Sequence, residues 1–323
     1  MTKPKLLISR KIYDQVLTQL NDHFDVEYNA GDVVYSKEEL IKKLQGKSAV
    51  MTTGTERIDK TVLVACPELK ICANIAVGYN NFDVSSMTAH GVLATNTPDV
   101  LTETTADFGF ALMMAAARRI SESEHYLRKG FWTKWSLDMF TGADVHSSTL
   151  GILGMGRIGQ AVAKRGAHGF GMNVIYHNRS KLSDPLEQAC KARYVSKEEL
   201  LRQSDHLVLV LPYTQEVHHC IAEKELGMMK RTATLTNIAR GGIVDDAALV
   251  KALRSGVIAA AGLDVFENEP QLNPDLLGLS NVVLTPHIAS SSTKTRTAMA
   301  QLAADNLIAF FKHGKALNPI NQL

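Results

Sequence analysis

One turn of this 323-residue sequence has a clear chemical meaning: Gly154-Met155-Gly156-Arg157-Ile158-Gly159. It follows an apolar segment, 149–153, and opens a segment with helical spacing. In such a turn the first glycine permits a tight bend, the second lets the backbone approach a pyrophosphate, and the third lets helix and strand pack closely. Backbone N–H groups at the helix start then bind the phosphate charge. A purely structural turn is the alternative, and the strand–turn–helix context favours a dinucleotide site.

The residues after the next predicted strand bear on which dinucleotide would bind. The segment Tyr176-His177-Asn178-Arg179-Ser180-Lys181 holds no carboxylate, whereas an NAD site usually has an Asp or Glu there for the ribose hydroxyls. Arg179 could bind a 2′-phosphate in a fork and Ser180 could donate to it, and we expect Asn178 in the same site. The alternative is that Arg179 is a solvated loop residue. The sequence favours NADP, with NAD as the second choice.

Three polar clusters each follow a later strand of the same series. They are Asn237-Ile238-Ala239-Arg240-Gly241-Gly242, Leu263-Asp264-Val265-Phe266-Glu267-Asn268-Glu269-Pro270 and Thr285-Pro286-His287-Ile288-Ala289. Ligands bind such sheets at the carboxyl ends of the strands, so we expect the clusters to share one edge. Each candidate alone has an ordinary explanation: His287 as a packing residue, Arg240 as a turn stabiliser, Glu269 as a solvated loop acid. Because all three clusters follow strands of the same series as the glycine turn, the sequence favours one shared site.

At these clusters the sequence resembles the D-2-hydroxyacid dehydrogenase family, and the resemblance covers essentially the whole chain. The early loop Val77-Gly78-Tyr79-Asn80-Asn81-Phe82-Asp83 matches as well. Within the family the sequence is most similar to glyoxylate/hydroxypyruvate reductases that also reduce 2-ketogluconate. That closer likeness depends on this loop, on Val100-Leu101-Thr102-Glu103-Thr104 and on the uncharged strand end at Asn178.

The resemblance implies a role for each matching residue in the reduction of a 2-keto acid. His287 would supply the proton, because an imidazole titrates near working pH. Glu269 would hold the ring and stabilise the imidazolium, and Arg240 would bind the carboxylate and polarise the carbonyl. Backbone N–H groups of Val77 and Gly78 would bind the substrate carboxylate.

Further contacts to the dinucleotide are expected beyond the glycine turn. Asp264 resembles the residue that holds the nicotinamide amide. The other expected contacts are Thr104, Leu211, Pro212, Ile238 and Ala239.

The implied activity is an NADPH-preferring reduction of glyoxylate, hydroxypyruvate or 2-ketogluconate to D-2-hydroxy acids by hydride transfer. A phosphoglycerate dehydrogenase-like enzyme is one alternative; the uncharged strand end and the lack of an added regulatory domain weigh against it. A dinucleotide-sensing binding protein of the corepressor type is the other. The lack of long disordered extensions weighs against that one.

The elements that must position these residues form two α/β series. The first series has predicted strands at 6–9, 24–28, 48–51 and 69–77, and a capping box at Ser36 and Glu39. The second has six predicted strands separated mostly by helices, which indicates a doubly wound Rossmann sheet. These strands are 149–153, 173–177, 206–211, 233–237, 259–263 and 282–285.

The resemblance implies a discontinuous arrangement of two domains. Residues 1–101 plus 293–323 would form a flavodoxin-like substrate domain, and residues 102–292 the NAD(P)-binding Rossmann domain. The active site would lie in the cleft, and closure of the domains would exclude water from the hydride transfer.

A long segment with helical spacing, 102–119, is apolar nearly all round and must be buried on several sides. We favour an interface role for it over one inside a single domain, and we expect homodimerisation through it. The segment with Trp132 and Trp135 resembles the family's loop after this helix, where residues reach the partner subunit's site. Plain packing is the alternative, and Trp135 has no assigned role.

Composition excludes several classes of partner. Charged residues make up 21% and the formal net charge is +2, so neither nucleic acid nor an anionic membrane is expected as a partner. No apolar stretch approaches the ~20 residues that span a bilayer. The four cysteines form no Cys-x-x-Cys pair, and the N-terminus resembles a first strand more than a signal peptide, so we expect a cytoplasmic protein with buried thiols.

A metal site is not expected. His218 and His219 are predicted to lie in a surface helix, where adjacent side chains point to different faces. No other spacing of His, Asp and Glu suggests metal ligands.

Overall fold

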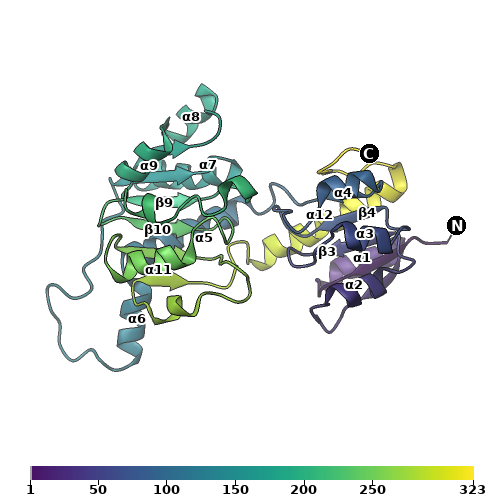
Figure 1. Cartoon of the computed structure of the whole chain (residues 1–323), viewed down its shortest axis with the longest axis horizontal. Coiled ribbons are helices and arrows are strands. Elements are labelled where there is room, and N and C mark those ends of the chain that lie inside the picture. The colour runs from purple at the N-terminus through teal and green to yellow at the C-terminus, as the bar shows by residue number, and fades with distance from the viewer. Residues whose placement is uncertain (1) are drawn as a thin grey trace. The chain divides into compact units, whose positions relative to one another are not determined.

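The computed structural model describes residues 2–323, which form two compact α/β units (Figure 1). The first unit comprises the residues up to Leu101 together with Ser291–Leu323, and the second comprises Thr102–Ser290. Both sheets are entirely parallel, as the alternating pattern of strands and helices predicts.

The first unit is built on a five-stranded sheet in the order β2-β1-β3-β4-β5, the flavodoxin-like order. Its strands are β1 (Lys5–Ile8), β2 (Asp25–Tyr28), β3 (Ala49–Thr52), β4 (Ile71–Asn74) and β5 (Leu93–Thr95). Its helices are α1 (Asp14–His23), α2 (Lys37–Leu44), α3 (Lys60–Ala65), α4 (Val84–Ala89) and α12 (Thr293–His313). The flavodoxin-like expectation is therefore confirmed.

Successive residues of β1 face opposite sides of this sheet, and both sides are covered. Leu6 and Ile8 pack with α1 and α12, while Leu7 packs with α2 and α3. The yellow α12 thus joins the purple N-terminal elements in one core (Figure 1). The helix ends at Gly314, whose φ of 71° is the left-handed conformation that commonly closes helices.

Two details of the first unit differ from the sequence expectation. β4 ends at Asn74, three residues earlier than predicted, because the apolar run continues into a loop after the strand. β5 was not predicted, since three residues are too few for an alternating pattern to show. The predicted capping box is confirmed: the Ser36 hydroxyl accepts from the Glu39 N–H, and the Glu39 carboxylate accepts from the Ser36 N–H.

The second unit is built on a seven-stranded sheet in the order β12-β11-β10-β9-β6-β7-β8. Its strands are β6 (Thr149–Leu153), β7 (Asn173–His177), β8 (Ala192–Tyr194), β9 (His206–Leu209), β10 (Thr234–Asn237), β11 (Ala260–Leu263) and β12 (Val282–Leu284). The order reverses beside β6, as in a Rossmann sheet. Six strands were predicted here; β8 was missed because it is a short edge strand with no apolar run.

The helices of this unit cover both faces of the sheet. They are α5 (Thr102–Ala117), α6 (Ile120–Arg128), α7 (Arg157–Lys164), α8 (Asp184–Cys190), α9 (Lys197–Gln203), α10 (Glu223–Leu226) and α11 (Asp246–Arg254). Among residues 2–323, no helix combines the length and the apolar character needed to cross a membrane.

The long apolar helix α5 is buried by its own unit. It packs on β10, β11 and α7, and a Cβ at Gly262 of β11 would lie 2.8 Å from the Leu112 side chain. One face of the helix stays open, with Ala111 exposed and Phe108 and Met114 only partly buried, and the interface role of this helix stays a prediction. Large apolar side chains are exposed instead on α6 and the loop after it, which project from the unit in Figure 1.

Candidate active site

The glycine turn links β6 to α7, as its sequence predicts. Gly154 has a φ of 103°, and a Cβ there would lie 2.7 Å from the Leu211 nitrogen. A Cβ at Gly159 would collide with the carbonyl oxygen of Gly154, so helix and strand pack as closely as backbone permits. Gly156 is the N-cap of α7, and a Cβ there would meet nothing within 4 Å. Open space in front of a helix N-terminus is the geometry that a pyrophosphate requires.

The end of β7 is bound to this turn. The Asn178 side-chain oxygen accepts a hydrogen bond of 2.6 Å from the Met155 N–H, and the Asn178 carbonyl accepts one of 3.1 Å from the Tyr194 hydroxyl. Arg179 and Ser180 follow directly and are exposed. Their side chains are therefore accessible beside the phosphate-binding turn, with no carboxylate in the 176–181 segment to repel an anion.

Arg240 lies in a loop that follows β10 and is braced by Asn237. The Asn237 side chain donates to the Arg240 carbonyl at 3.1 Å and accepts from the Ala239 N–H at 3.0 Å. The Arg240 guanidinium donates to the Ala239 carbonyl at 2.7 Å. Burial lowers the pKa of Arg240, and the charge of Glu269 opposes that shift. The half-buried guanidinium and Glu269 are thus electrostatically coupled.

Asp264, which follows β11, is fully buried and holds the loop that carries His287. Its carboxylate accepts from the Thr285 hydroxyl and from the N–H groups of Ile288 and Ala289, each at 2.8 Å. Burial raises the pKa of Asp264, although these hydrogen bonds oppose the shift. The Asp264 carbonyl also accepts from the His287 N–H at 2.9 Å.

His287 and Glu269 form a close pair. The His287 Nδ1 lies 2.7 Å from the Glu269 Oε2, with the imidazole 46% exposed and the carboxylate side chain 32% exposed. Burial opposes ionisation of Glu269, but the hydrogen bond with His287 and its charge outweigh burial and lower the pKa of Glu269. Its other oxygen accepts from the Phe266 N–H at 2.8 Å. His287 has a φ of 53°, in the left-handed region that is strained for a residue other than glycine.

Val77 and Gly78 belong to the first unit, in the loop after β4. Their carbonyls accept hydrogen bonds from two asparagine side chains, Asn96 to Val77 at 2.8 Å and Asn74 to Gly78 at 3.0 Å. Their N–H groups form no hydrogen bond with any of residues 2–323, and both residues are only partly buried. Two adjacent N–H groups in this state can bind a carboxylate.

The remaining predicted cofactor contacts lie on three elements of the second unit. Thr104 stands in the first turn of α5, Leu211 and Pro212 follow β9, and Ile238 and Ala239 follow β10. Ile238 and Ala239 are buried, whereas Pro212 is exposed. Figure 1 shows β9 and β10 side by side, so their following residues leave one edge of the sheet.

Comparison with known proteins identifies this arrangement. Residues 110–289 match the family described as "D-isomer specific 2-hydroxyacid dehydrogenase, NAD binding domain". The chain belongs to this family. It is an NAD(P)-dependent oxidoreductase with a Rossmann-like nucleotide-binding fold.

Named relatives of this dehydrogenase extend over nearly its whole length. A glyoxylate reductase from Thermococcus onnurineus is 49% identical over 317 residues, which cover 97% of this chain and 94% of that protein. The crystal structure of a glyoxylate reductase from Paecilomyes thermophila has a TM-score of 0.89 at 34% identity and covers 99% of each chain. The crystal structure of an NADPH-dependent glyoxylate/hydroxypyruvate reductase from Sinorhizobium meliloti, in complex with NADP and malonate, has a TM-score of 0.86 at 35% identity. The match covers 99% of this chain and 97% of that chain.

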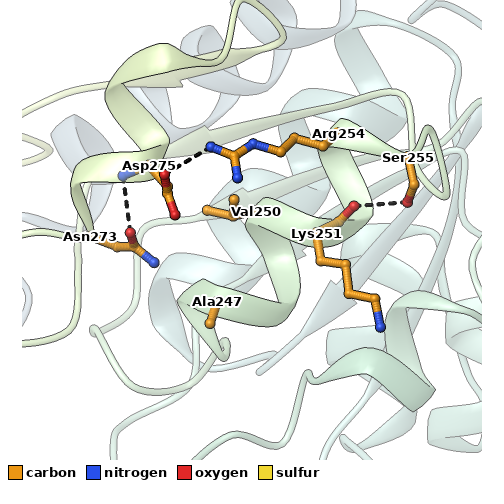
Figure 2. A pocket seen from close by; sticks show the side chains of 7 residues that line it. All are labelled: Ala247, Val250, Lys251, Arg254, Ser255, Asn273 and Asp275. Atoms are coloured by element: carbon orange, nitrogen blue, oxygen red, sulfur yellow. Dashed lines mark hydrogen bonds and ion pairs between the residues drawn. The ribbon is translucent and has the colours of Figure 1, made fainter.

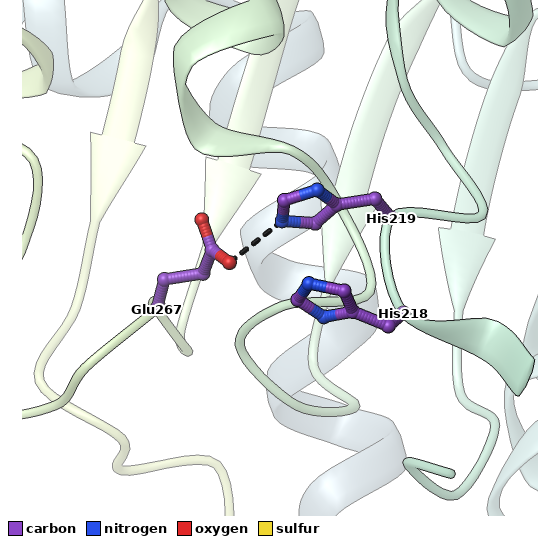
Figure 3. Close-up of side chains that lie close together, drawn as sticks. All are labelled: His218, His219 and Glu267. Atoms are coloured by element: carbon purple, nitrogen blue, oxygen red, sulfur yellow. Dashed lines mark hydrogen bonds and ion pairs between the residues drawn. The ribbon is translucent and has the colours of Figure 1, made fainter. Parts of the chain in front are cut away.

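The histidine pair of this dehydrogenase does not lie as predicted. His218 and His219 follow a single 3-10 turn, Gln215–Val217, and are not in a helix. Their rings stack with centroids 3.9 Å apart, because His219 has a left-handed φ of 51° that turns its side chain back beside its neighbour (Figure 3). Each offers one ligand atom that lies within 4.8 Å of the other's and of a Glu267 oxygen. The argument that the two side chains face apart, which excluded a metal here, is wrong.

A separate surface pocket of the dehydrogenase, of about 400 Å³, lies on α11 and the 3-10 turn Pro274–Gly278 (Figure 2). Two charged side chains at this pocket are already paired: Arg254 with Asp275 at 2.9 Å, and Lys251 with Glu223 at 2.7 Å. No predicted site residue lines it. We assign it no chemistry.

Sequence reasoning missed the residues that support the dehydrogenase's site. Asn74 and Asn96 hold the loop of Val77 and Gly78, and His219 contacts Glu267. A signal for Asn74 was present, because a polar residue within an apolar strand is buried only when it is hydrogen-bonded. No comparable local signal marks His219, whose partner is 48 residues away.

Proposed function

We propose that this dehydrogenase reduces small 2-keto acids to D-2-hydroxy acids, with NADPH as its preferred hydride donor. Glyoxylate, hydroxypyruvate and 2-ketogluconate are the proposed substrates. The observation that carries the proposal is the His287–Glu269 pair, 2.7 Å apart and coupled to the charge of Arg240. A proton donor, a carboxylate that holds it and a fixed cation are what carbonyl reduction beside a carboxylate needs.

The residues of the glycine turn fit a bound dinucleotide. The open space at Gly156 and the N-terminus of α7 suit its pyrophosphate, and exposed Arg179 and Ser180 suit a 2′-phosphate. When bound, the reduced nicotinamide supplies the hydride. We propose that Thr104, Leu211, Pro212, Ile238 and Ala239 line the same site. Asp264 stays a proposed contact of the nicotinamide amide; in this structure its side chain is fully buried and both carboxylate oxygens bind its own chain.

His287 donates the proton to the developing alkoxide in the proposed reaction. Its Nδ1 faces Glu269, so the transfer uses Nε2. The hydrogen bond with His287 lowers the pKa of Glu269, so this carboxylate is ionised at neutral pH and holds the imidazole ring in place. Oxidation of the hydroxy acid uses the same groups in reverse.

Arg240 and the loop of Val77 and Gly78 orient the substrate in this scheme. The guanidinium stays charged at any working pH, so it binds the carboxylate and polarises the carbonyl through the whole reaction. The N–H groups of Val77 and Gly78, in the first unit, are a second proposed anchor for a substrate carboxylate. On this basis we propose that the first unit is the substrate domain and the second the nucleotide domain.

We also propose that the protein is a homodimer. The support is a group of exposed apolar side chains on α6 and the following loop, because exposed apolar patches mark sites of protein–protein contact. They are Ile120, Leu127, Phe131, Trp132, Trp135 (73% exposed) and Leu137 (85% exposed). Light scattering coupled to size-exclusion chromatography should give twice the chain mass; a monomeric mass would contradict this part of the proposal.

A steady-state comparison tests the activity and the cofactor preference together. We expect turnover of at least one of the three acids, higher kcat/KM with NADPH than with NADH, and loss of turnover in His287→Ala. Arg179→Asp should lower the preference for NADPH by roughly 10- to 100-fold, since it removes a charge-assisted hydrogen bond worth about 1.5–3 kcal/mol. Failure of every 2-keto acid in the panel would favour a dinucleotide-sensing protein. An unchanged cofactor preference in Arg179→Asp would disprove the 2′-phosphate assignment.

A further inference from the structure

A hydrogen bond between the side chains of His219 and Glu267 joins two loops of the second unit, and the main chain of His219 joins a third. The proposed mechanism uses neither contact. We propose that His219 and Glu267 form a clamp that positions Arg240 and Glu269 for catalysis. This inference rests on the proposed function, because it assigns positioning residues to the same reaction.

His219 contacts two of the loops at once. Its main-chain N–H donates to the Gly242 carbonyl at 2.7 Å, two residues from Arg240. Its Nε2 lies 2.7 Å from the Glu267 Oε1, two residues from Glu269 (Figure 3). His219 therefore bridges the loop that carries Arg240 and the loop that carries Glu269.

His219 has a strained backbone conformation, which its contacts with the two loops would hold in place. Its φ of 51° lies in the left-handed region, which costs a non-glycine residue about 1–3 kcal/mol and persists only where the surroundings fix it. Asn268 beside Glu267 has a φ of 60°, and Gly242 has one of 77°. Left-handed residues therefore occur at both ends of the clamp, where each loop turns sharply.

Glu267 is itself held from its other side. Its N–H donates to the buried Asp246 carboxylate at 3.2 Å, at the start of α11. The two loops also touch directly, since a Cβ at Gly241 would collide with the Phe266 carbonyl. The backbone contact between Gly241 and Phe266 sets how closely these two loops approach. The His219–Glu267 hydrogen bond adds a directional contact that limits lateral displacement of the Glu267 loop.

A metal ion shared by His218, His219 and Glu267 is a weaker interpretation of the same cluster. The two rings are tilted by only 22°, so their in-plane lone pairs run side by side and do not converge on one ion. His219 is already hydrogen-bonded to Glu267, and His218 Nδ1 lies 3.1 Å from the Tyr213 hydroxyl.

The clamp should act more on chemistry and on substrate binding than on the dinucleotide. Arg240 binds the substrate carboxylate and Glu269 holds the proton donor, so a small displacement of either lowers kcat and raises the KM of the keto acid. The glycine turn and the segment from Asn178 to Ser180, which carry the proposed phosphate contacts, follow β6 and β7 and lie outside the three loops, so the Kd of NADPH should change far less than kcat/KM. A role in general stability would instead lower Tm and weaken both ligands.

The test is a double-mutant cycle in the full-length enzyme with His219→Ala, Glu267→Ala and the double variant, assayed with EDTA present. Each single variant should lower kcat/KM for the keto acid by roughly 10- to 100-fold, the scale of a misplaced catalytic group. The double variant should be no worse than the worse single variant, because the two side chains act as one unit. NADPH affinity should fall far less than kcat/KM.

Two further variants separate the clamp from its neighbours. His219→Gln keeps an N–H donor near the Nε2 position and should recover most of the lost kcat/KM. His218→Ala removes the stacked ring but not the bond, and should change kcat/KM by less than about twofold, as surface substitutions usually do.

Four outcomes would overturn the clamp. The first two are single-variant effects that multiply in the double variant, and wild-type-like activity in His219→Ala. The third is a parallel loss of Tm and NADPH affinity. The fourth is stoichiometric Zn²⁺ binding that His218→Ala abolishes. A wild-type enzyme that reduces no keto acid would instead reject the proposed function. In that case oxalate binding to the enzyme–NADPH complex still tests the clamp: weaker binding in His219→Ala supports it and equal binding overturns it.

Discussion

The glycine turn and the His287–Glu269 pair are two parts of one nucleotide-binding unit, and they are built in opposite ways. The turn consists of six consecutive residues whose function depends on backbone shape: Gly154 bends it and Gly159 lets α7 approach β6. The pair joins side chains 18 residues apart, and the loop that carries His287 is held by Asp264, which follows β11. A local motif can therefore specify a binding site, whereas the proton-transfer site requires several strands to be in place.

The largest expected effect separates these two regions by function. Glu269→Gln keeps the size of the side chain but removes the negative charge that lies 2.7 Å from the His287 ring. We expect kcat for keto-acid reduction to fall by about 100-fold, within the range for acid–base groups, while the Kd of NADPH stays the same. Stopped-flow rates and fluorescence titration of NADPH measure the two quantities.

A matched control for this variant is Glu223→Gln, which removes an exposed carboxylate paired with Lys251 on the same unit. Its rate should equal that of the wild type. If Glu269→Gln weakens NADPH binding as much as it slows turnover, the two regions are not independent.

The next effect tests the turn itself, through two glycines with different surroundings. A methyl group at Gly159 meets backbone, so Gly159→Ala should lower the free energy of unfolding by about 1–3 kcal/mol. A methyl group at Gly156 meets open space, so Gly156→Ala should fold with normal stability and yet bind NADPH more weakly, since the methyl occupies the space expected for the pyrophosphate.

Chemical denaturation and NADPH titration on the two glycine variants give the comparison. Normal NADPH affinity in Gly156→Ala would show that the phosphate does not approach this position. Equal destabilisation by both variants would contradict the packing described for the turn.

The smallest effect concerns the carboxylate behind the catalytic loops. Burial, opposed in part by the Glu267 N–H, raises the pKa of Asp246 to about 6, with the charges of Glu267 and Asp245 adding to the shift and that of His219 opposing it. The folded protein therefore holds this proton more tightly than the unfolded chain does. Ionisation of Asp246 costs stability as the pH rises from about 4 to about 6, and the full cost remains above that range.

Asp246→Asn removes this cost while keeping an oxygen that can accept from Glu267. At about pH 8 the variant should be more stable than the wild type by about 1 kcal/mol, after allowance for solvent screening, and the difference should vanish below about pH 4. Unfolding free energies measured across this range check the sign. Lower stability of the variant at pH 8 would mean that the ionised carboxylate stabilises the fold.

Much of the fold was predictable because its signals are local. The strands 149–153 and 173–177 were located to the residue, since each is a buried apolar run next to a glycine turn or a polar loop. Short strands were not: β5 and β8 have three residues each and are defined mainly by the neighbour with which they pair. The burial of α5 was predicted, but the elements that pack against it were not, because an apolar sequence predicts burial without specifying the packing partner.

The sequence by itself determined the parallel α/β class, the glycine turn and the order of the polar clusters along the chain, because strand length, backbone freedom and the sites after strands are properties of consecutive residues. Tertiary structure alone decided which members of those clusters meet. It brought His287 against Glu269 and turned His219 back beside His218 and onto Glu267, contrary to the helical prediction. Such contacts depend on strand order and on loop backbones held in strained conformations, and no stretch of neighbouring residues encodes either one.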